Sequence, residues 1–94
     1  MDDALEADEA LTAKTIHSFI RDGRLTTIPA REKRRRIIYR YLRDQVFTED
    51  RAYPEAEVNQ RLALFHRDAA TIRRGMVDAG LVTREAGEYR RGTD

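Results

Sequence analysis

The sequence predicts a mainly α-helical domain with a small β-hairpin, built as a winged helix-turn-helix that follows an N-terminal helix. Three observations support this fold class: a strong helical period over residues 30–46, two further helical segments joined by a short polar turn, and a C-terminal segment that alternates around a central turn. Because the chain has 94 residues and no internal repeat, we expect a single domain.

The chain begins with an acidic head. Residues 1–10 contain five acidic residues and no basic residue, and no compact apolar pattern starts before Leu11. We therefore expect residues 1–10 to be disordered and residues 11–94 to form the domain. A first helix is predicted over residues 11–21, and residues 24–28 are predicted to form a short strand that pairs with the C-terminal hairpin.

The helix predicted over residues 30–46 has two distinct faces. Apolar residues recur every three to four positions and are expected to face the core: Ile37, Ile38, Tyr41, Leu42 and Val46. At about 100° per residue, the opposite face carries a basic stripe: Lys33, Arg36, Arg40 and Arg43. We interpret this stripe as a solvated helix face, with contacts to phosphate groups as the alternative.

Two more helices are predicted over residues 54–64 and 68–79. Pro54 suits the first position of the former helix, because proline there loses no hydrogen bond and already has a helical φ. Asp68 can cap the latter helix by accepting from backbone N–H groups near Thr71.

The helix over residues 68–79 is expected to direct Ile72 and Met76 into the core and to end at Gly80, where a left-handed cap is needed. Residues 81–91 form the predicted hairpin. In a winged helix-turn-helix, residues 68–79 are then the recognition helix and residues 81–91 the wing.

The recognition helix and the wing carry the candidate DNA contacts. Once the apolar positions face the core, seven residues are left to meet a duplex: Arg67, Thr71, Arg73, Arg74, Arg84, Arg90 and Arg91. Arginine suits this role because its planar guanidinium matches phosphate groups and guanine edges. The alternative is that Arg73 or Arg74 pairs inside the domain. The candidate internal partners are Glu55, Glu57 and Asp78.

The charge outside the acidic head is moderately basic. It amounts to 18 bases against 12 acids, a net charge of +6, and only Lys14 and Lys33 among the bases are lysines. A basic body favours a polyanionic partner. A GC-rich genome produces the same preference for arginine, so composition alone does not identify that partner.

No constellation of catalytic residues is found. The absence of cysteine excludes disulfides, thiolate zinc sites and cysteine nucleophiles. Ser18, the single serine, lies in a predicted amphipathic helix without a glycine-rich elbow, and His17 and His66 each lack a second histidine at chelating spacing. Glu55 and Glu57 lie two positions apart on a helix and face different directions. We expect no enzymatic activity, no cofactor and no metal ion.

No apolar run approaches the roughly 20 residues that span a bilayer, and the acidic start lacks the layout of a signal peptide. We therefore expect a cytoplasmic protein with no membrane partner.

Several motifs resemble one bacterial family, called domain of unknown function 2087, over about residues 19–91. The motifs are Arg24-Leu25, Ile28-Pro29-Ala30, Lys33, the segment from Tyr53 to Asn59, the segment from Asp68 to Arg74, Val77-Asp78 and the segment from Gly80 to Arg84. The resemblance implies a winged-helix module in a transcriptional context, because some members are joined to helix-turn-helix regulators. We expect a DNA-binding regulatory module with duplex DNA as its partner. The alternative is a non-catalytic module for protein interaction or homodimerisation.

Overall fold

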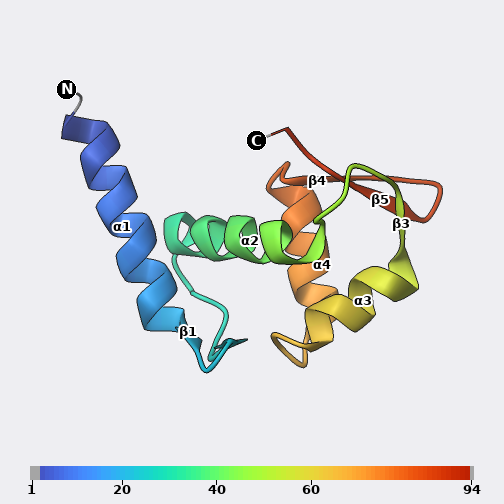
Figure 1. The fold of residues 1–94 in the computed structure, drawn as a ribbon, viewed down its shortest axis with the longest axis horizontal. Coiled ribbons are helices and arrows are strands. Elements are labelled where there is room, and N and C mark those ends of the chain that lie inside the picture. The colour runs from blue at the N-terminus through green and yellow to red at the C-terminus, as the bar shows by residue number, and fades with distance from the viewer. Residues whose placement is uncertain (1–2, 94) are drawn as a thin grey trace.

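The computed structural model describes residues 3–93, in which four helices and five short strands follow one another (Figure 1). Their bounds are α1 Asp3–Phe19, β1 Ile20–Arg21, β2 Arg24–Leu25, α2 Glu32–Val46, β3 Tyr53–Pro54, α3 Glu55–Ala63, α4 Ala69–Asp78, β4 Val82–Glu85 and β5 Glu88–Arg91. The strands form one two-stranded and one three-stranded antiparallel sheet. The predicted class, mainly helical with a small β-hairpin, is confirmed at this level.

Helix α1 starts well before the predicted first helix. It begins at Asp3, so residues 3–10 are helical where we expected disorder. This segment is rich in alanine, the best helix former, and its acidic residues lie at the N-terminal end, where the helix dipole favours negative charge. The first two residues of the predicted acidic head lie outside the described range.

The segment after α1 folds as its own small hairpin. Strands β1 and β2 pair with each other around Asp22-Gly23, a dipeptide typical of two-residue hairpin turns. The prediction that residues 24–28 pair with the C-terminal hairpin is therefore wrong: β2 pairs with β1, its Leu25 N–H donates to the Phe65 carbonyl, and β3 is the strand that joins the hairpin. The same turn ends α1 at Phe19, short of the predicted end at residue 21.

The strand that joins the C-terminal hairpin in the three-stranded sheet is β3. The order of this sheet is β3-β5-β4, with Tyr53 opposite Tyr89 and Pro54 opposite Glu88. Pro54 therefore ends a strand and lies at the cap position of α3, with φ −60° and ψ 148°, instead of starting the helix. The pairing brings the start of α3 beside the C-terminal hairpin.

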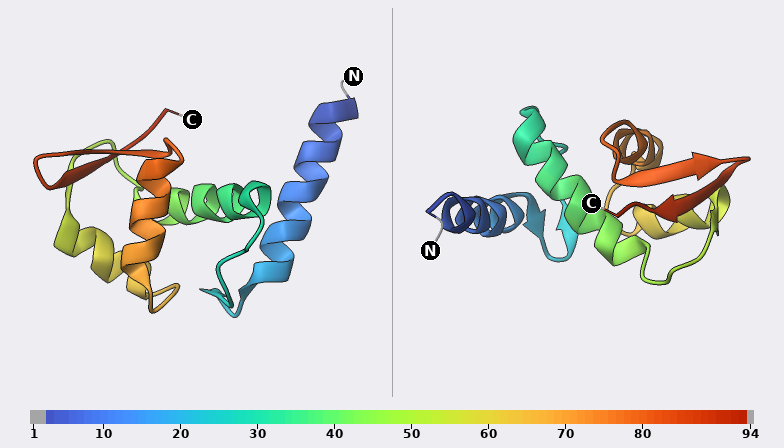
Figure 2. Two further views of the ribbon diagram at one scale, coloured as in Figure 1. Left: turned by 180° about the vertical axis from the view of Figure 1, so that it is seen from behind. Right: turned by 90° about the horizontal axis from the view of Figure 1, so that it is seen from above.

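Helices α2, α3 and α4 enclose the main core, and α1 lies against α2 on the opposite side from the hairpin (Figures 1 and 2). The core contains five of the predicted inward positions: Ile38, Leu42, Val46, Ile72 and Met76. Val58 and Leu62 of α3 and the sheet tyrosines Tyr53 and Tyr89 complete it. Ile37 and Tyr41, also predicted to be core residues, are only half-buried. They line a shallow groove with Thr12 and Ile16 of α1.

Both ends of α4 have the predicted caps. The Asp68 carboxylate accepts from the Thr71 backbone N–H at 3.2 Å. At the other end Gly80 has a φ of +75°, which glycine adopts without steric cost. Its N–H donates to the Val77 carbonyl and the next N–H donates to the Met76 carbonyl, as in a Schellman cap.

A close approach between α2 and α4 depends on a glycine in the middle of α4. Tyr39, which is 4% exposed, packs its ring on the backbone at Gly75. A Cβ atom at position 75 would lie 2.7 Å from Cζ and 2.8 Å from the hydroxyl oxygen of Tyr39. Only a residue without a side chain permits this packing, because real Cβ atoms do not approach ring atoms so closely.

We expect Gly75→Ala to destabilise the fold. Alanine improves helix propensity by about 1 kcal/mol, but overpacking against Tyr39 costs roughly 1 to 3 kcal/mol, so the net change in the free energy of unfolding should be a loss. Urea unfolding followed by circular dichroism measures it. In a double-mutant cycle with Tyr39→Leu, the two substitutions should be strongly non-additive. A Gly75→Ala variant as stable as the wild type would contradict the packing argument.

Candidate nucleic-acid interface

The outer face of α4 is the candidate interface. Ile72 and Met76 point inward, as predicted, and leave Thr71, Arg74 and Asp78 exposed on the opposite side. These three residues are spaced i, i+3 and i+7, so they form one stripe along the helix. Arg74 forms no hydrogen bond or ion pair with any residue in the described range 3–93, and its guanidinium is available to a ligand.

Two clefts lie on either side of this stripe. One, of about 420 Å³, separates α4 from the N-terminal half of α2, and the other, of about 460 Å³, separates α4 from the hairpin β4–β5. Arg74 and Asp78 line both clefts. The α4 stripe is therefore a ridge between two hollows, each of a size typical of ligand sites.

Arg73 does not belong to the outer face, contrary to the prediction. It is only 8% exposed, and its guanidinium donates to the Asn59 side-chain oxygen. Its Nε lies 3.7 Å from a Glu55 carboxylate oxygen, and the guanidinium lies 5.8 Å from the centre of the Tyr89 ring. The alternative of an internal pair with Glu55 is thus correct for Arg73. The next residue along the helix, Arg74, is turned by about 100° and reaches the surface.

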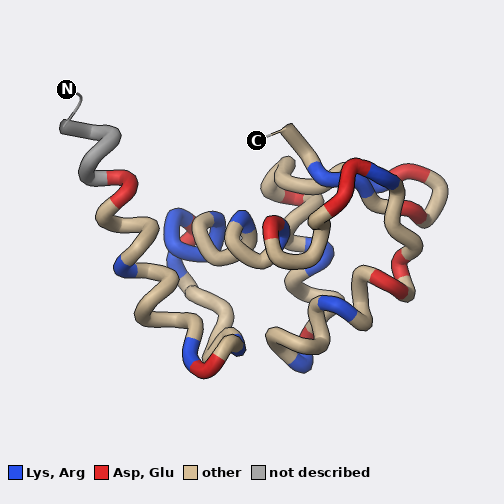
Figure 3. The backbone as a smooth tube through the Cα atoms, in the orientation of Figure 1, with Lys and Arg blue, Asp and Glu red and all other residues tan. Residues whose placement is uncertain are grey.

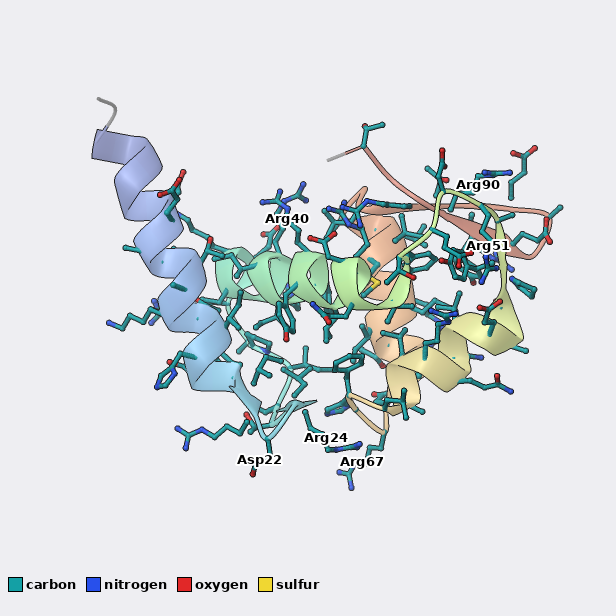
Figure 4. The ribbon with its side chains drawn as sticks, in the orientation of Figure 1. Asp22, Arg24, Arg40, Arg51, Arg67 and Arg90 are labelled. Carbon is teal, nitrogen blue, oxygen red and sulfur yellow. The ribbon has the colours of Figure 1, made fainter. Side chains whose placement is uncertain are left out.

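Glu57, a second candidate partner for these arginines, is occupied elsewhere. Its carboxylate receives hydrogen bonds from Arg51 at 2.6 and 3.1 Å and from Arg61 at 3.0 Å. These bonds lower the pKa of Glu57. The Arg51 guanidinium also stacks 3.7 Å from the centre of the Tyr53 ring, beside β3 (Figure 4).

The cleft between α4 and the hairpin β4–β5, called the wing-side cleft after the predicted wing, contains a hydrogen bond that joins β5 to α3. The Tyr89 hydroxyl donates to the Glu55 carboxylate at 2.6 Å. This hydrogen bond lowers the pKa of Glu55, and the positive charge of Arg73 lowers it further. The hairpin is therefore anchored to the helix pair through one charge-assisted hydrogen bond.

The three predicted wing arginines do not share one surface. Arg84 is exposed and lies opposite Tyr89 in the strand register, so it shares the face of the hairpin that looks onto α4. Arg90 lies opposite Thr83 and belongs to the other face. Arg91 is engaged by Asp44 of α2 at 2.8 Å. Strand alternation and this ion pair make Arg84 the one predicted wing residue beside the α4 ridge.

Arg67 lies ahead of α4 in the loop after α3, exposed and close to Arg24 at the end of the molecule away from Arg90 (Figure 4). It forms no hydrogen bond or ion pair with the residues that the structure describes. The predicted DNA contacts therefore divide: Thr71, Arg74 and Arg84 lie on or face the outer side of α4, and Arg67 precedes the helix, whereas Arg73, Arg90 and Arg91 lie elsewhere.

The predicted basic stripe on α2 is interrupted. Arg36 donates to the Ala79 carbonyl at 2.6 Å, and Arg43, only 3% exposed, donates to the Leu81 carbonyl at 3.3 Å. These two residues hold the turn between α4 and β4, so interpreting the stripe as a solvated face is wrong for them. Lys33 and Arg40 are exposed, and Arg40 points away from the body of the molecule (Figure 4). Basic and acidic positions are both found along most of the described elements (Figure 3).

The cleft between α2 and α4 contains residues that the sequence analysis missed. Tyr39, Gly75 and Arg35 line it together with Thr71 and Arg74. A glycine inside a helical pattern is a signal of close packing and could have pointed to Gly75. The position of Tyr39 on the same face requires the crossing of the two helices, which periodicity does not provide.

Other chemistry is sparse in the described part of the chain. Residues 3–93 contain no group of three or more His, Asp or Glu side chains placed to bind a metal ion. His17 is exposed, and His66 accepts a hydrogen bond from the Asp68 N–H through Nδ1 at 3.0 Å. None of the helices in this range is long and apolar enough to cross a membrane.

The chain is similar to one known family. The family model DUF2087, described as an uncharacterized protein conserved in bacteria, matches residues 24–91. The match begins at β2, ends at the last residue of β5 and leaves α1 outside it. No curated protein and no solved structure matches the chain.

The Tyr89–Glu55 bond leads to a pH-dependent prediction. Folding lowers the pKa of Glu55, so its contribution to stability is present above the pKa of the unfolded chain and is lost as pH falls through the folded value. Tyr89→Phe removes the main cause of the shift. We expect the variant to be less stable than the wild type at about pH 7, with a smaller difference at about pH 3. Urea unfolding of both proteins at both pH values measures this difference in the free energy of unfolding.

Tyr41→Phe is the matched control, because the Tyr41 hydroxyl forms no hydrogen bond within residues 3–93. A Tyr89→Phe loss that is equal at both pH values would contradict the assignment of the bond to the ionised Glu55.

Proposed function

The chain belongs to the DUF2087 family, which is conserved in bacteria, and from this starting point we propose that it is a DNA-binding module of a transcription regulator. The observation that carries the proposal is the outer stripe of α4. It presents Thr71 and Arg74 to solvent, the Arg74 guanidinium forms no hydrogen bond or ion pair among the described residues, and Arg84 faces the stripe across a cleft.

The order of elements supports a winged helix-turn-helix. Helix α2 is followed by the short strand β3, the helix pair α3–α4 and the hairpin β4–β5, and β3 completes a sheet of order β3-β5-β4. In this architecture α4 is the recognition helix and the hairpin is the wing. The loop between α3 and α4, residues 64–68, is short, and its length is close to the three to four residues typical of the motif.

The proposed contacts are Arg67, Thr71, Arg74 and Arg84. Arginine and threonine both donate hydrogen bonds to phosphate oxygens, and arginine also reads guanine. Arg73 has a positioning role instead: its hydrogen bond to Asn59 and its ion pair with Glu55 fix α4 against α3. We propose no catalytic role.

One observation favours the alternative, a protein-interaction module. Several arginines are used inside the fold, among them Arg73 and Arg91, so the surface near α4 is less basic than the sequence alone predicts. The two functions differ in their dependence on salt, because neutralisation of DNA phosphates releases counterions.

We predict that the domain binds duplex DNA with a shallow salt dependence. Three arginine contacts give a slope of about −3 when the logarithm of the binding constant is plotted against the logarithm of the salt concentration. Arg74→Ala should weaken binding by roughly 1 to 3 kcal/mol if it reads a base, or flatten the slope by about one if it meets a phosphate. Fluorescence anisotropy with labelled random duplex at several salt concentrations measures both quantities.

The matched control is Arg21→Ala, which removes the same charge from an exposed residue of the β1–β2 hairpin, away from α4. It should leave affinity nearly unchanged. If the wild type shows no binding at low ionic strength, or if Arg21→Ala and Arg74→Ala have equal effects, the DNA-binding function is wrong and the interaction module takes its place.

A further inference from the structure

The cleft between α2 and α4 contains a donor that the fold does not use. Tyr39 is 4% exposed, yet its hydroxyl forms no hydrogen bond with any residue in the range 3–93. Its terminal ring atoms lie on the backbone of Gly75, and both residues line the 420 Å³ cleft. Burial raises the pKa of Tyr39, so the phenol keeps its proton and remains a donor at neutral pH.

The charged residues around the cleft favour an anion. Arg35 and Arg36 come from α2 and Arg74 from α4, against two acidic residues, Glu32 and Asp78. Arg35 is held by the Pro29 and Ala30 carbonyls at 3.3 and 2.8 Å, and Arg36 by the Ala79 carbonyl. The Arg35 bonds go to neutral carbonyl acceptors and fix its guanidinium without an acidic partner in the range 3–93. Arg35 and Arg74 therefore both present a positive charge to a ligand in the cleft.

We propose that this cleft binds a phosphate group of the DNA backbone, with the Tyr39 hydroxyl and the Arg74 guanidinium as its direct donors. The inference rests on the proposed DNA-binding function and adds a contact from α2, which is not part of the helix pair α3–α4. Tyrosine, threonine and arginine side chains all donate to phosphate oxygens in protein–DNA complexes.

Backbone phosphate fits the cleft better than a free phosphate ester for a geometric reason. Arg74 and Asp78 line this cleft and the wing-side cleft alike, so the site is continuous with the outer stripe of α4. A duplex lying along that stripe passes the opening, and its phosphates are spaced along the groove edge. A phosphate contact of this kind positions α4 without reading sequence.

Tyr39→Phe tests the proposal, because it removes the hydroxyl and leaves the ring on Gly75. Duplex affinity should fall roughly threefold to tenfold, the usual worth of one hydrogen bond, and by the same factor for unrelated duplex sequences. The salt slope should stay unchanged, because a neutral donor releases no counterion, whereas Arg74→Ala should flatten it by about one. Tyr41→Phe, on the same helix, is the matched control and should bind like the wild type.

Thermal unfolding of Tyr39→Phe gives an independent readout. Because the hydroxyl has no internal partner, its removal should leave Tm unchanged or raise it. A lower Tm would show that the hydroxyl is bonded inside the fold and would overturn the proposal. Wild-type duplex binding that is weakened by Arg74→Ala but not by Tyr39→Phe would also overturn it, while the DNA-binding function would survive.

Failure of the wild type to bind any duplex is a different outcome and rejects the proposed function itself. A titration with adenosine monophosphate tests whether the cleft instead binds a free phosphate ester. It is done at constant ionic strength and followed by the amide signals of Thr71 and Gly75. Saturable binding of this nucleotide that Tyr39→Phe abolishes, without any duplex binding, would assign the cleft to a free phosphate ester and overturn the backbone proposal.

Discussion

The contact between Tyr39 and Gly75 is the constraint on which the arrangement of the other elements depends. Because the ring lies directly on the backbone of α4, α2 and α4 cross at close range. The C-terminal end of α4 then comes within reach of α2, where Arg36 and Arg43 donate hydrogen bonds to the carbonyls of Ala79 and Leu81. Strand β4 starts from this fixed turn, so the direction of the hairpin relative to α4 depends on the absence of a side chain at Gly75.

The hairpin is held at further points by charged side chains. Arg91 binds Asp44 of α2, and Tyr89 binds Glu55, the residue that also lies beside Arg73. A buried guanidinium is costly unless acceptors surround it, and Arg73 meets the Asn59 oxygen and the Glu55 carboxylate, although its Nε forms no hydrogen bond within residues 3–93. Arg73 and Arg91 each have an acidic partner within the fold, Glu55 and Asp44 respectively. The fold therefore uses arginine for its own architecture before any arginine is available to a ligand.

This use of arginine explains what the sequence could and could not predict. The bounds of α2, α3 and α4 were predicted to within two residues, because apolar periodicity, the Asp68 cap and the Gly80 cap are local signals. The partners of Arg73 and Arg43 come from other helices and are set by tertiary packing, so the outward positions of α4 and the α2 stripe were partly wrong. Strand β3 was missed because a two-residue strand has no period, and only its pairing with β5 defines it.

The charges along α4 give the proposed recognition helix a direction. Arg67 precedes the helix, Thr71 and Arg74 occupy its first two turns, and Asp78 ends the same stripe. The Asp68 carboxylate binds the Thr71 side chain and accepts from the Thr71 N–H, and these two interactions lower its pKa. The positive end of the helix dipole coincides with the basic end of the stripe, and the carboxylate of Asp78 repels phosphate at the other end. In the proposed complex, α4 therefore meets the duplex with its N-terminal turns, between the cleft of Tyr39 and the wing residue Arg84.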